Sequence, residues 1–133
     1  MKIFKCRHIL VVLWLLSIHA LAQTPDFSSV PGSVVAYSAA SSGLYIGSPS
    51  IAILPNGDYV ASHDYFGPKS NEHVRATSRV YKSTDRGKSW KQISEIDGQF
   101  WSKLFVHQKQ LFIFGTDRHH GHTIIRKSTD GGN

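Results

Sequence analysis

The chain has 133 residues and a formal net charge of +6 at pH 7. Three of its 15 Lys and Arg residues fall in residues 1–22, which hold no acidic residue, so the other 111 residues carry 12 basic and 9 acidic side chains, a net charge of +3. Several of these basic residues are scattered around one turn: Lys82, Arg86, Lys88 and Lys91. Nucleic-acid binding needs a clustered basic face, so no nucleic-acid partner is expected.

Residues 1–22 are predicted to be a secretory signal peptide. Three basic residues precede an apolar run at residues 9–16, and Ala-Leu-Ala at residues 20–22 fits a cleavage site before Gln23. The run is shorter than the ~20 residues of a spanning helix. The only cysteine, Cys6, precedes the run, so it is not a lipid-anchor cysteine, and the mature chain has no disulfide. We expect a secreted or periplasmic protein without a membrane anchor.

Residues 23–44 are rich in Ser, Ala, Pro and Gly and are expected to form an extended lead-in rather than a domain. From Tyr45 onward, short apolar or alternating runs indicate β-strands at residues 50–54, 58–62, 77–82 and 90–96. The Asn-Gly pair within residues 55–58 favours a tight hairpin. No apolar pattern with helical spacing persists for three turns, so the sequence predicts an all-β protein.

The same order of runs begins again at residues 102–107, 111–115 and 123–128. Ser128 follows Ser83 by 45 residues in the same Ser-Thr-Asp context. A period in the forties with about four strands per unit is typical of a β-propeller built from four-stranded antiparallel blades. Residues 45–133 are therefore expected to hold one full blade and about three quarters of the next.

Two turns share the pattern Ser-x-Asp-x-Gly. The Ser and Asp side chains of such a turn can hydrogen-bond within it, and the Gly supplies a backbone angle that other residues resist. A following Trp can cover the turn and exclude water. We therefore expect a structural role, rather than a catalytic one, for the residues of both turns: Ser83, Asp85, Gly87 and Trp90, and Ser128, Asp130 and Gly132.

These residues resemble the Ser-x-Asp-x-Gly-x-x-Trp Asp box, or BNR repeat, of the sialidase (neuraminidase) superfamily, the second turn matching the first half of the box. The phrase GTDRHHGHTIIRKSTDGG also resembles secreted bacterial sialidase-like proteins. The resemblance covers roughly residues 45–133 and implies a propeller of six blades, of which this chain is an N-terminal fragment. It also implies an exo-α-sialidase type of glycoside hydrolase that acts on glycans without a cofactor. Two blades alone would leave strand edges and an apolar face open.

Candidate site segments gather on one face of such blades, because the loops after second strands and the segments entering first strands lie on the same side. These segments are residues 45–49, 63–76, 98–101 and 116–122. They combine carboxylates, arginines, histidines and aromatic residues on loops. Aromatic faces stack on sugar rings, arginine pairs with carboxylates, and carboxyl groups perform acid-base steps. The composition fits a carbohydrate site.

Asp64 and Glu72 are the candidate catalytic carboxylates, since the family's acid follows the second strand. Candidate substrate-binding residues on this face are Arg118, His119, Arg75, His63 and Tyr45. Other roles stay open: Asp64 and Asp117 as loop caps, and Glu72 with Arg75 as a solvated ion pair. The histidines at residues 119–122 lack a carboxylate or cysteine at a recognisable ligand spacing, so no metal is expected.

The sequence departs from the family pattern at two positions. Gly47 stands where a Phe-Arg-Ile-Pro-like motif places the first arginine of the carboxylate-gripping triad, and Asn71 stands beside Glu72 where an acid is expected. Asparagine cannot transfer a proton in that role. The family's Tyr nucleophile and remaining arginines come from later blades. The alternative is therefore a noncatalytic Asp-box propeller that binds glycan or protein.

Overall fold

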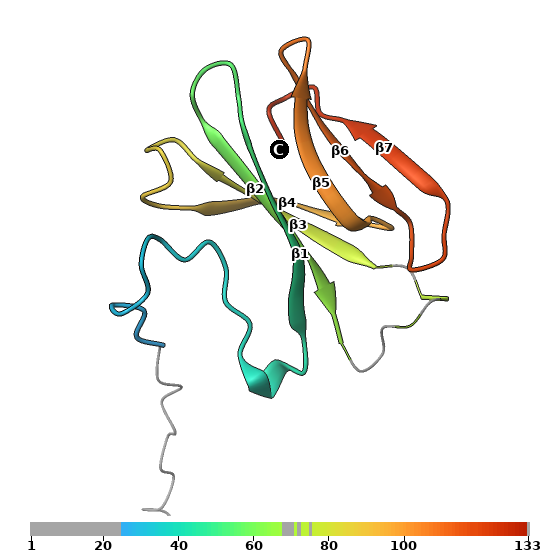
Figure 1. Ribbon diagram of the computed structural model, residues 1–133, viewed down its shortest axis with the longest axis horizontal. Coiled ribbons are helices and arrows are strands. Elements are labelled where there is room, and N and C mark those ends of the chain that lie inside the picture. Colours follow the sequence, from blue (N-terminus) through green and yellow to red (C-terminus); the bar gives the residue numbers. More distant parts are fainter. Residues whose placement is uncertain (1–24, 68–70, 72, 75, 133) are drawn as a thin grey trace, which may run out of the picture.

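A computed structural model describes residues 25–67, 71, 73–74 and 76–132 (Figure 1). Their regular structure is seven β-strands and the 3-10 helix η2 (Ala40–Ser42). No α-helix occurs among these residues, which confirms the all-β expectation. A helix of the length and apolarity needed to cross a membrane is likewise missing from this part of the chain.

The strands form two antiparallel sheets, each a meander in chain order. Sheet A consists of β1 (Tyr45–Ile53), β2 (Tyr59–Phe66), β3 (Thr77–Ser83) and β4 (Lys91–Asp97). Sheet B consists of β5 (Phe100–His107), β6 (Gln110–Thr116) and β7 (Thr123–Lys127). The described residues contain no closed ring of sheets.

The turn between β1 and β2 forms the hairpin that its Asn-Gly pair predicts. The Leu54 N–H donates to the Asp58 carbonyl at 2.8 Å, and the Asn56 side chain accepts from the Asp58 N–H at 3.1 Å. Gly57 has φ +89°, a conformation that costs a glycine little. These local contacts fix the register in which Ile53 pairs with Tyr59.

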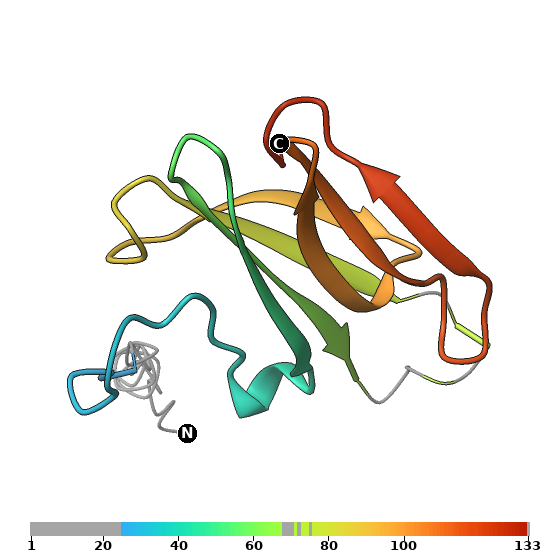
Figure 2. The same ribbon diagram turned by 45° about the horizontal axis from the view of Figure 1, so that its top comes forward.

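Sheet B packs across one face of sheet A, with β5 beside β1 and β2 (Figure 2). The Leu104 N–H of β5 donates to Ser50 Oγ of β1 at 2.8 Å. Buried aliphatic side chains from both sheets form the core between them: Leu54, Val60, Val80, Leu104, Leu111 and Ile113. Burying an aliphatic side chain of this size stabilises a fold by about 1.5–3 kcal/mol, so this contact holds the two sheets together.

Two strands are longer than the sequence predicts. Strand β2 continues to Phe66, so His63 and Asp64 lie within a strand, and their expected place in a loop was wrong. The ladder continues because Asp64 pairs with Gly47 on one side and with Ser78 on the other. Strand β1 likewise begins at Tyr45, which places residues 45–49 in the sheet.

A β-bulge recurs in the first strand of each sheet. The register shifts between Gly47 and Ser50 in β1, and between Phe100 and Lys103 in β5. Inside these bulges, Ser48 has φ +50° and Trp101 has φ +49°. Non-glycine residues rarely adopt such angles, so the repeat of the two sheets extends to backbone conformation. The serine and the tryptophan share no sequence pattern that would reveal it.

The two Ser-x-Asp-x-Gly turns have the same hydrogen bonds. In the first, Ser83 Oγ donates to Asp85 Oδ1 at 2.7 Å and accepts from the Gly87 N–H at 2.7 Å. In the second, Ser128 Oγ donates to Asp130 Oδ1 at 2.9 Å and accepts from the Gly132 N–H at 2.6 Å. One hydroxyl in each turn therefore joins the carboxylate to the backbone.

The first turn is also covered by its tryptophan and joined to the lead-in. Trp90 Nε1 donates to the Gly87 carbonyl at 3.1 Å and to Ser33 Oγ at 3.2 Å. Both turn glycines have positive φ, +85° at Gly87 and +104° at Gly132. A side chain at either position would strain the backbone.

Stability should fall in acid through Asp85. Hydrogen bonds from the Ser89 side chain and N–H and from Ser83 hold the pKa of Asp85 well below its usual range. A carboxylate whose pKa is lower in the folded state than in the unfolded state stabilises the fold at pH values above its unfolded-state pKa, which is about 4. This stabilisation is lost as the pH falls through the pKa of the folded state. Urea unfolding at pH 7 and pH 3 is expected to show a smaller acid loss for Ser89→Ala than for the wild type. An equal loss would contradict this assignment.

Candidate functional site

Aromatic rings meet at the end of the sheets where β2 stops and β5 begins. Phe66 lies edge-on to Phe100 at 5.0 Å between centroids, and Phe100 stacks on Trp101 at 5.3 Å with 20° between planes. Trp101 contacts His119 at 4.6 Å, and His119 stacks on His120 at 4.4 Å. We call these five residues the aromatic cluster. It brings together three elements: the end of β2, the start of β5 and the loop between β6 and β7.

Like His119 and His120, Trp101 is exposed in the aromatic cluster. Its side chain leaves the chain at the bulge of β5 and is 48% exposed, whereas Phe100 beneath it is 6% exposed. Bulges break the regular alternation of side chains and re-aim a residue, often beside a functional site. A buried ring thus supports a ring that solvent can reach.

The Phe66 ring packs against Gly47. A Cβ atom at residue 47 would lie 2.2 Å from Cε2 of the Phe66 ring. The ring therefore packs directly against the backbone of β1, at the position where the sialidase pattern has an arginine. An arginine could be placed there only if Phe66 moved away.

Asp117 and Arg118 form an ion pair on the loop that carries His119. Arg118 Nη2 lies 3.3 Å from Asp117 Oδ2, and the His122 N–H donates to Asp117 Oδ1 at 2.8 Å. Burial raises the pKa of Asp117, but the hydrogen bonds from Arg118 and His122 outweigh it and hold the pKa below its usual range. Asp117 thus caps its own loop, and the Arg118 side chain remains 37% exposed beside the aromatic cluster.

Asp64 lies inside the protein, between the sheets, with 0% of its surface exposed. Its carboxylate accepts hydrogen bonds from Ser78 Oγ on β3 and, at 3.0 Å, from the Ser102 N–H on β5. Ser78 Oγ also lies 3.0 Å from Ser102 Oγ and from the Gln99 carbonyl. The carboxylate therefore ties sheet A to sheet B, and a ligand in solvent cannot reach it in this arrangement.

His63 lies on the opposite face of sheet A, because successive strand residues point to opposite sides. Its ring lies edge-on to Tyr65 at 4.7 Å and stacks on Tyr81 at 5.4 Å, with Nε2 3.1 Å from the Tyr81 hydroxyl. Burial lowers the pKa of His63, which favours the neutral ring. The structure does not bring His63 together with the aromatic cluster.

Of the remaining candidate residues, one lies beside the aromatic cluster and two lie outside the described residues. Tyr45 is 66% exposed and pairs with Phe66 at the end of sheet A, beside the aromatic cluster. Glu72 and Arg75 lie outside the described residues. Within the described ranges, no group of three His, Cys, Asp or Glu side chains is placed to hold a metal ion.

Sequence reasoning did not single out Trp101 as a binding residue. The sequence predicts residues 98–101 on this face, but it gives no sign that Trp101 has a left-handed conformation (φ +49°) within a bulge. Phe66 and Phe100 were missed for a similar reason, because both appear as ordinary strand residues in the sequence. The only available signal was the density of aromatic residues in the segments that enter and leave strands.

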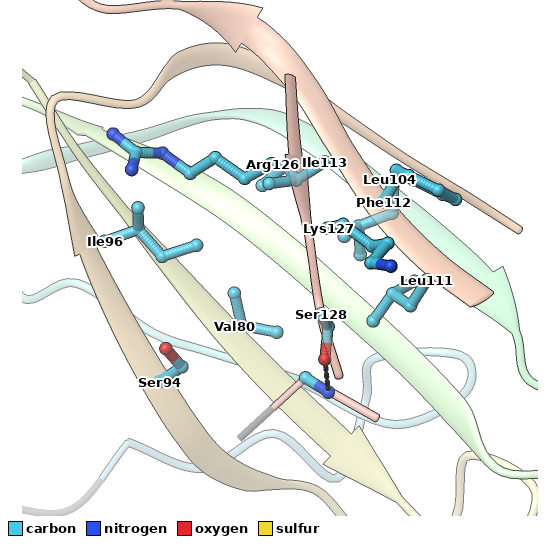
Figure 3. Close-up of a pocket in the computed structure, with 11 residues that line it drawn as sticks. Val80, Ser94, Ile96, Leu104, Leu111, Phe112, Ile113, Arg126, Lys127 and Ser128 are labelled. Carbon is cyan, nitrogen blue, oxygen red and sulfur yellow. Dashed lines mark hydrogen bonds between the residues drawn. The ribbon is translucent and has the colours of Figure 1, made fainter. Parts of the chain in front are cut away.

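A separate hollow of about 170 Å³ lies between the sheets (Figure 3). Val80, Ser94 and Ile96 of sheet A line one side. Residues of sheet B and of the turn that follows it line the other: Leu104, Leu111, Phe112, Ile113, Arg126, Lys127, Ser128 and Gly132. None of the lining residues has a carboxylate, so this hollow does not suit acid-base chemistry.

Comparison of the chain with models of protein families, with curated proteins and with solved structures found no match in any of the three.

Proposed function

We propose that this chain forms the first blades of a sialidase-like, Asp-box propeller that acts on glycans as an exported glycoside hydrolase. The observation that carries the proposal is the exposed aromatic cluster beside Arg118. It lies at the opposite end of sheet A from the Asp box, because β2 runs from Tyr59, which pairs with Ser83, to Phe66. Structural turns and binding residues are thus separated.

The outer faces of the sheets support a propeller. Alignment of Ser83 with Ser128 makes Val80 of sheet A equivalent to Ile125 of sheet B. Val80 is 3% exposed because sheet B covers it, whereas Ile125 is 59% exposed on the outside of sheet B. The outside of sheet B is therefore the counterpart of a face that another sheet buries. Further sheets stacked in the same way would continue the array.

The chemistry of the end face suits an acidic sugar. The C–H face of a sugar ring can pack on an exposed indole, and a guanidinium pairs with a carboxylate through charge-assisted hydrogen bonds. Arg118 already contacts Asp117, so a substrate carboxylate would share that guanidinium. Because Asp64 is buried, the proposed acid-base role falls to the other candidate carboxylate, Glu72.

The alternative function is a noncatalytic propeller that binds glycans. One specific observation favours it: the Phe66 ring occupies the space that a Cβ atom at residue 47 would need. Without that arginine, the grip on a substrate carboxylate is weaker than the family pattern implies. Binding to the aromatic cluster does not depend on it.

Hydrolysis of a fluorogenic sialoside by the full-length gene product tests the proposal. We expect turnover that falls by about 100-fold or more in Glu72→Gln, in the range typical of a general acid-base residue. The matched control is Glu95→Gln on β4, where the carboxylate pairs with Arg79, and this variant should retain turnover. Binding of the sialoside without turnover would favour the noncatalytic propeller. A protein that neither binds nor hydrolyses the sialoside would contradict both functions.

A further inference from the structure

We propose that Asp117 sets how tightly the protein holds an acidic sugar, because its carboxylate competes with the carboxylate of the sugar for the guanidinium of Arg118. The inference rests on the proposed function in taking an acidic sugar as the ligand and Arg118 as its contact. It adds a role for a residue that does not itself touch the sugar. Three features carry it: the contacts of Arg118, the charge of Asp117, and the hydrogen bonds of the loop between β6 and β7.

One side of the Arg118 guanidinium is occupied by Asp117. Nε lies 3.4 Å from Asp117 Oδ1, and Nη2 lies 3.3 Å from Asp117 Oδ2. A guanidinium has five N–H groups in a planar fork, so this pair leaves the N–H groups of Nη1 and one N–H of Nη2 for another acceptor. The Arg118 side chain is 37% exposed. A ligand carboxylate would therefore bind the edge formed by Nη1 and Nη2 while Asp117 holds the other edge.

Asp117 carries its charge at neutral pH and keeps it close to the guanidinium. Burial raises the pKa of Asp117, but the hydrogen bonds from Arg118 and His122 outweigh it and hold the pKa below its usual range. The residue is 8% exposed, so water and salt screen this charge only partly. A second carboxylate on the same guanidinium would be repelled by Asp117, because like charges a few ångströms apart repel more strongly than in bulk water. Asp117 therefore weakens the grip of Arg118 on an acidic ligand.

The hydrogen bonds of the loop between β6 and β7 require an acceptor at residue 117 but no charge. Asp117 Oδ1 accepts a hydrogen bond from the His122 N–H at 2.8 Å, and the Asp117 N–H donates to the His122 carbonyl at 3.1 Å. The Arg118 carbonyl accepts from Thr116 Oγ1 at 2.7 Å and from the Gly121 N–H at 3.2 Å. An asparagine side chain has nearly the same shape and accepts through its Oδ1. Asp117→Asn should therefore preserve the loop and remove the charge.

Ligand-observed NMR titration of the full-length protein at pH 7 with 3′-sialyllactose and with its neutral methyl ester tests this role. We expect the wild type to bind the acid more tightly than the ester. Asp117→Asn should bind the acid about three- to tenfold more tightly than the wild type, because a repelling charge is removed, and should bind the ester within about twofold of the wild type. The ratio of the two affinities therefore rises, which a purely structural role of Asp117 would not produce.

The matched control is Asp58→Asn in the hairpin between β1 and β2, where the carboxylate lies 3.2 Å from the ammonium group of Lys82. The chemical change is the same, but the hairpin lies at the opposite end of β2 from Phe66 and the aromatic cluster. This control should leave the affinities for the acid and the ester unchanged.

Variants of Arg118 show whether the effect of Asp117 passes through the guanidinium. In Arg118→Ala the acid should lose its advantage over the ester, and adding Asp117→Asn should not restore it. Arg118→Lys should lose most of that advantage too, because one ammonium group cannot present separate edges to two carboxylates. Arg118→Lys leaves Asp117 in place, so it tests the competition independently if urea unfolding shows that Asp117→Asn has lost its fold.

An unchanged or lower ratio in folded Asp117→Asn, the same rise in Asp58→Asn, or a wild-type ratio in Arg118→Lys would each overturn the role of Asp117. A wild type that binds the acid no better than the ester would overturn it as well. The sialoside assay is scored separately. Turnover with an unchanged ratio in Asp117→Asn overturns this role alone, and a raised ratio without turnover overturns only the hydrolase.

Discussion

Replacing Asp64 with alanine should lower the free energy of unfolding by about 3 kcal/mol, because a cavity would form between the sheets and the buried Ser102 N–H would lose its acceptor. The carboxylate is fully buried and accepts hydrogen bonds from Ser78 Oγ and the Ser102 N–H. Alanine would leave a cavity and the buried Ser102 N–H without its acceptor, whereas Ser78 Oγ could still donate to the Gln99 carbonyl at 3.0 Å. The change should be measured by urea unfolding at pH 7.

A double-mutant cycle with Ser78→Ala supplies the control. Since Ser78 and Asp64 share one buried network, their combined cost should fall short of the sum of the single costs by about 0.5 kcal/mol or more. A catalytic Asp64 predicts the opposite pattern: unchanged unfolding in Asp64→Ala with loss of sialoside turnover. That result would mean that the carboxylate becomes accessible in the working protein.

Gly115→Ala is expected to cost about 3 kcal/mol, at the upper end of what overpacking a well-packed core produces. A Cβ atom at residue 115 would lie 2.3 Å from the carbonyl oxygen of Phe100 and 2.8 Å from Gln99 Nε2. The nearest atom belongs to the backbone of β5, so the strain cannot be relieved by a rotamer change.

Sugar binding provides a second readout for Gly115→Ala, because the added Cβ atom would press on the backbone of Phe100. Phe100 supports Trp101, so sugar binding should weaken together with stability. The matched control is Gln110→Ala, an exposed change at the start of the same strand, which should stay within about 0.5 kcal/mol of the wild type. A Gly115→Ala variant as stable as this control would show that β5 and β6 can separate without cost.

The strands were largely predictable, because alternating apolar residues and turn residues carry most of the local signal. The Asn-Gly hairpin and the seven strands follow from short stretches of sequence. Strand ends were less predictable. His63 and Asp64 read as the start of a polar loop, yet pairing with β3 and burial under β5 extend the strand through them.

The candidate site was predictable in location but less so in its residues. Tyr45, Arg118 and His119 could be placed at one end of the sheets from strand order alone. The bulge that contains Trp101 and its stacking on Phe100 depend on strand pairing and on tertiary contacts. The Phe66 ring lies beside Gly47 because β1 and β2 pack together, which the sequence does not show.

The matching bulges give the protein two positions, Ser48 and Trp101, where the same backbone conformation carries different side chains. Exchanging the two side chains would move the indole from one sheet to its neighbour while the main chain kept its path. In an array of such sheets, the first strand of each sheet would provide one more bulge position at the same end of the array. Ligand preference could then evolve through single substitutions, one blade at a time, without redesign of the scaffold.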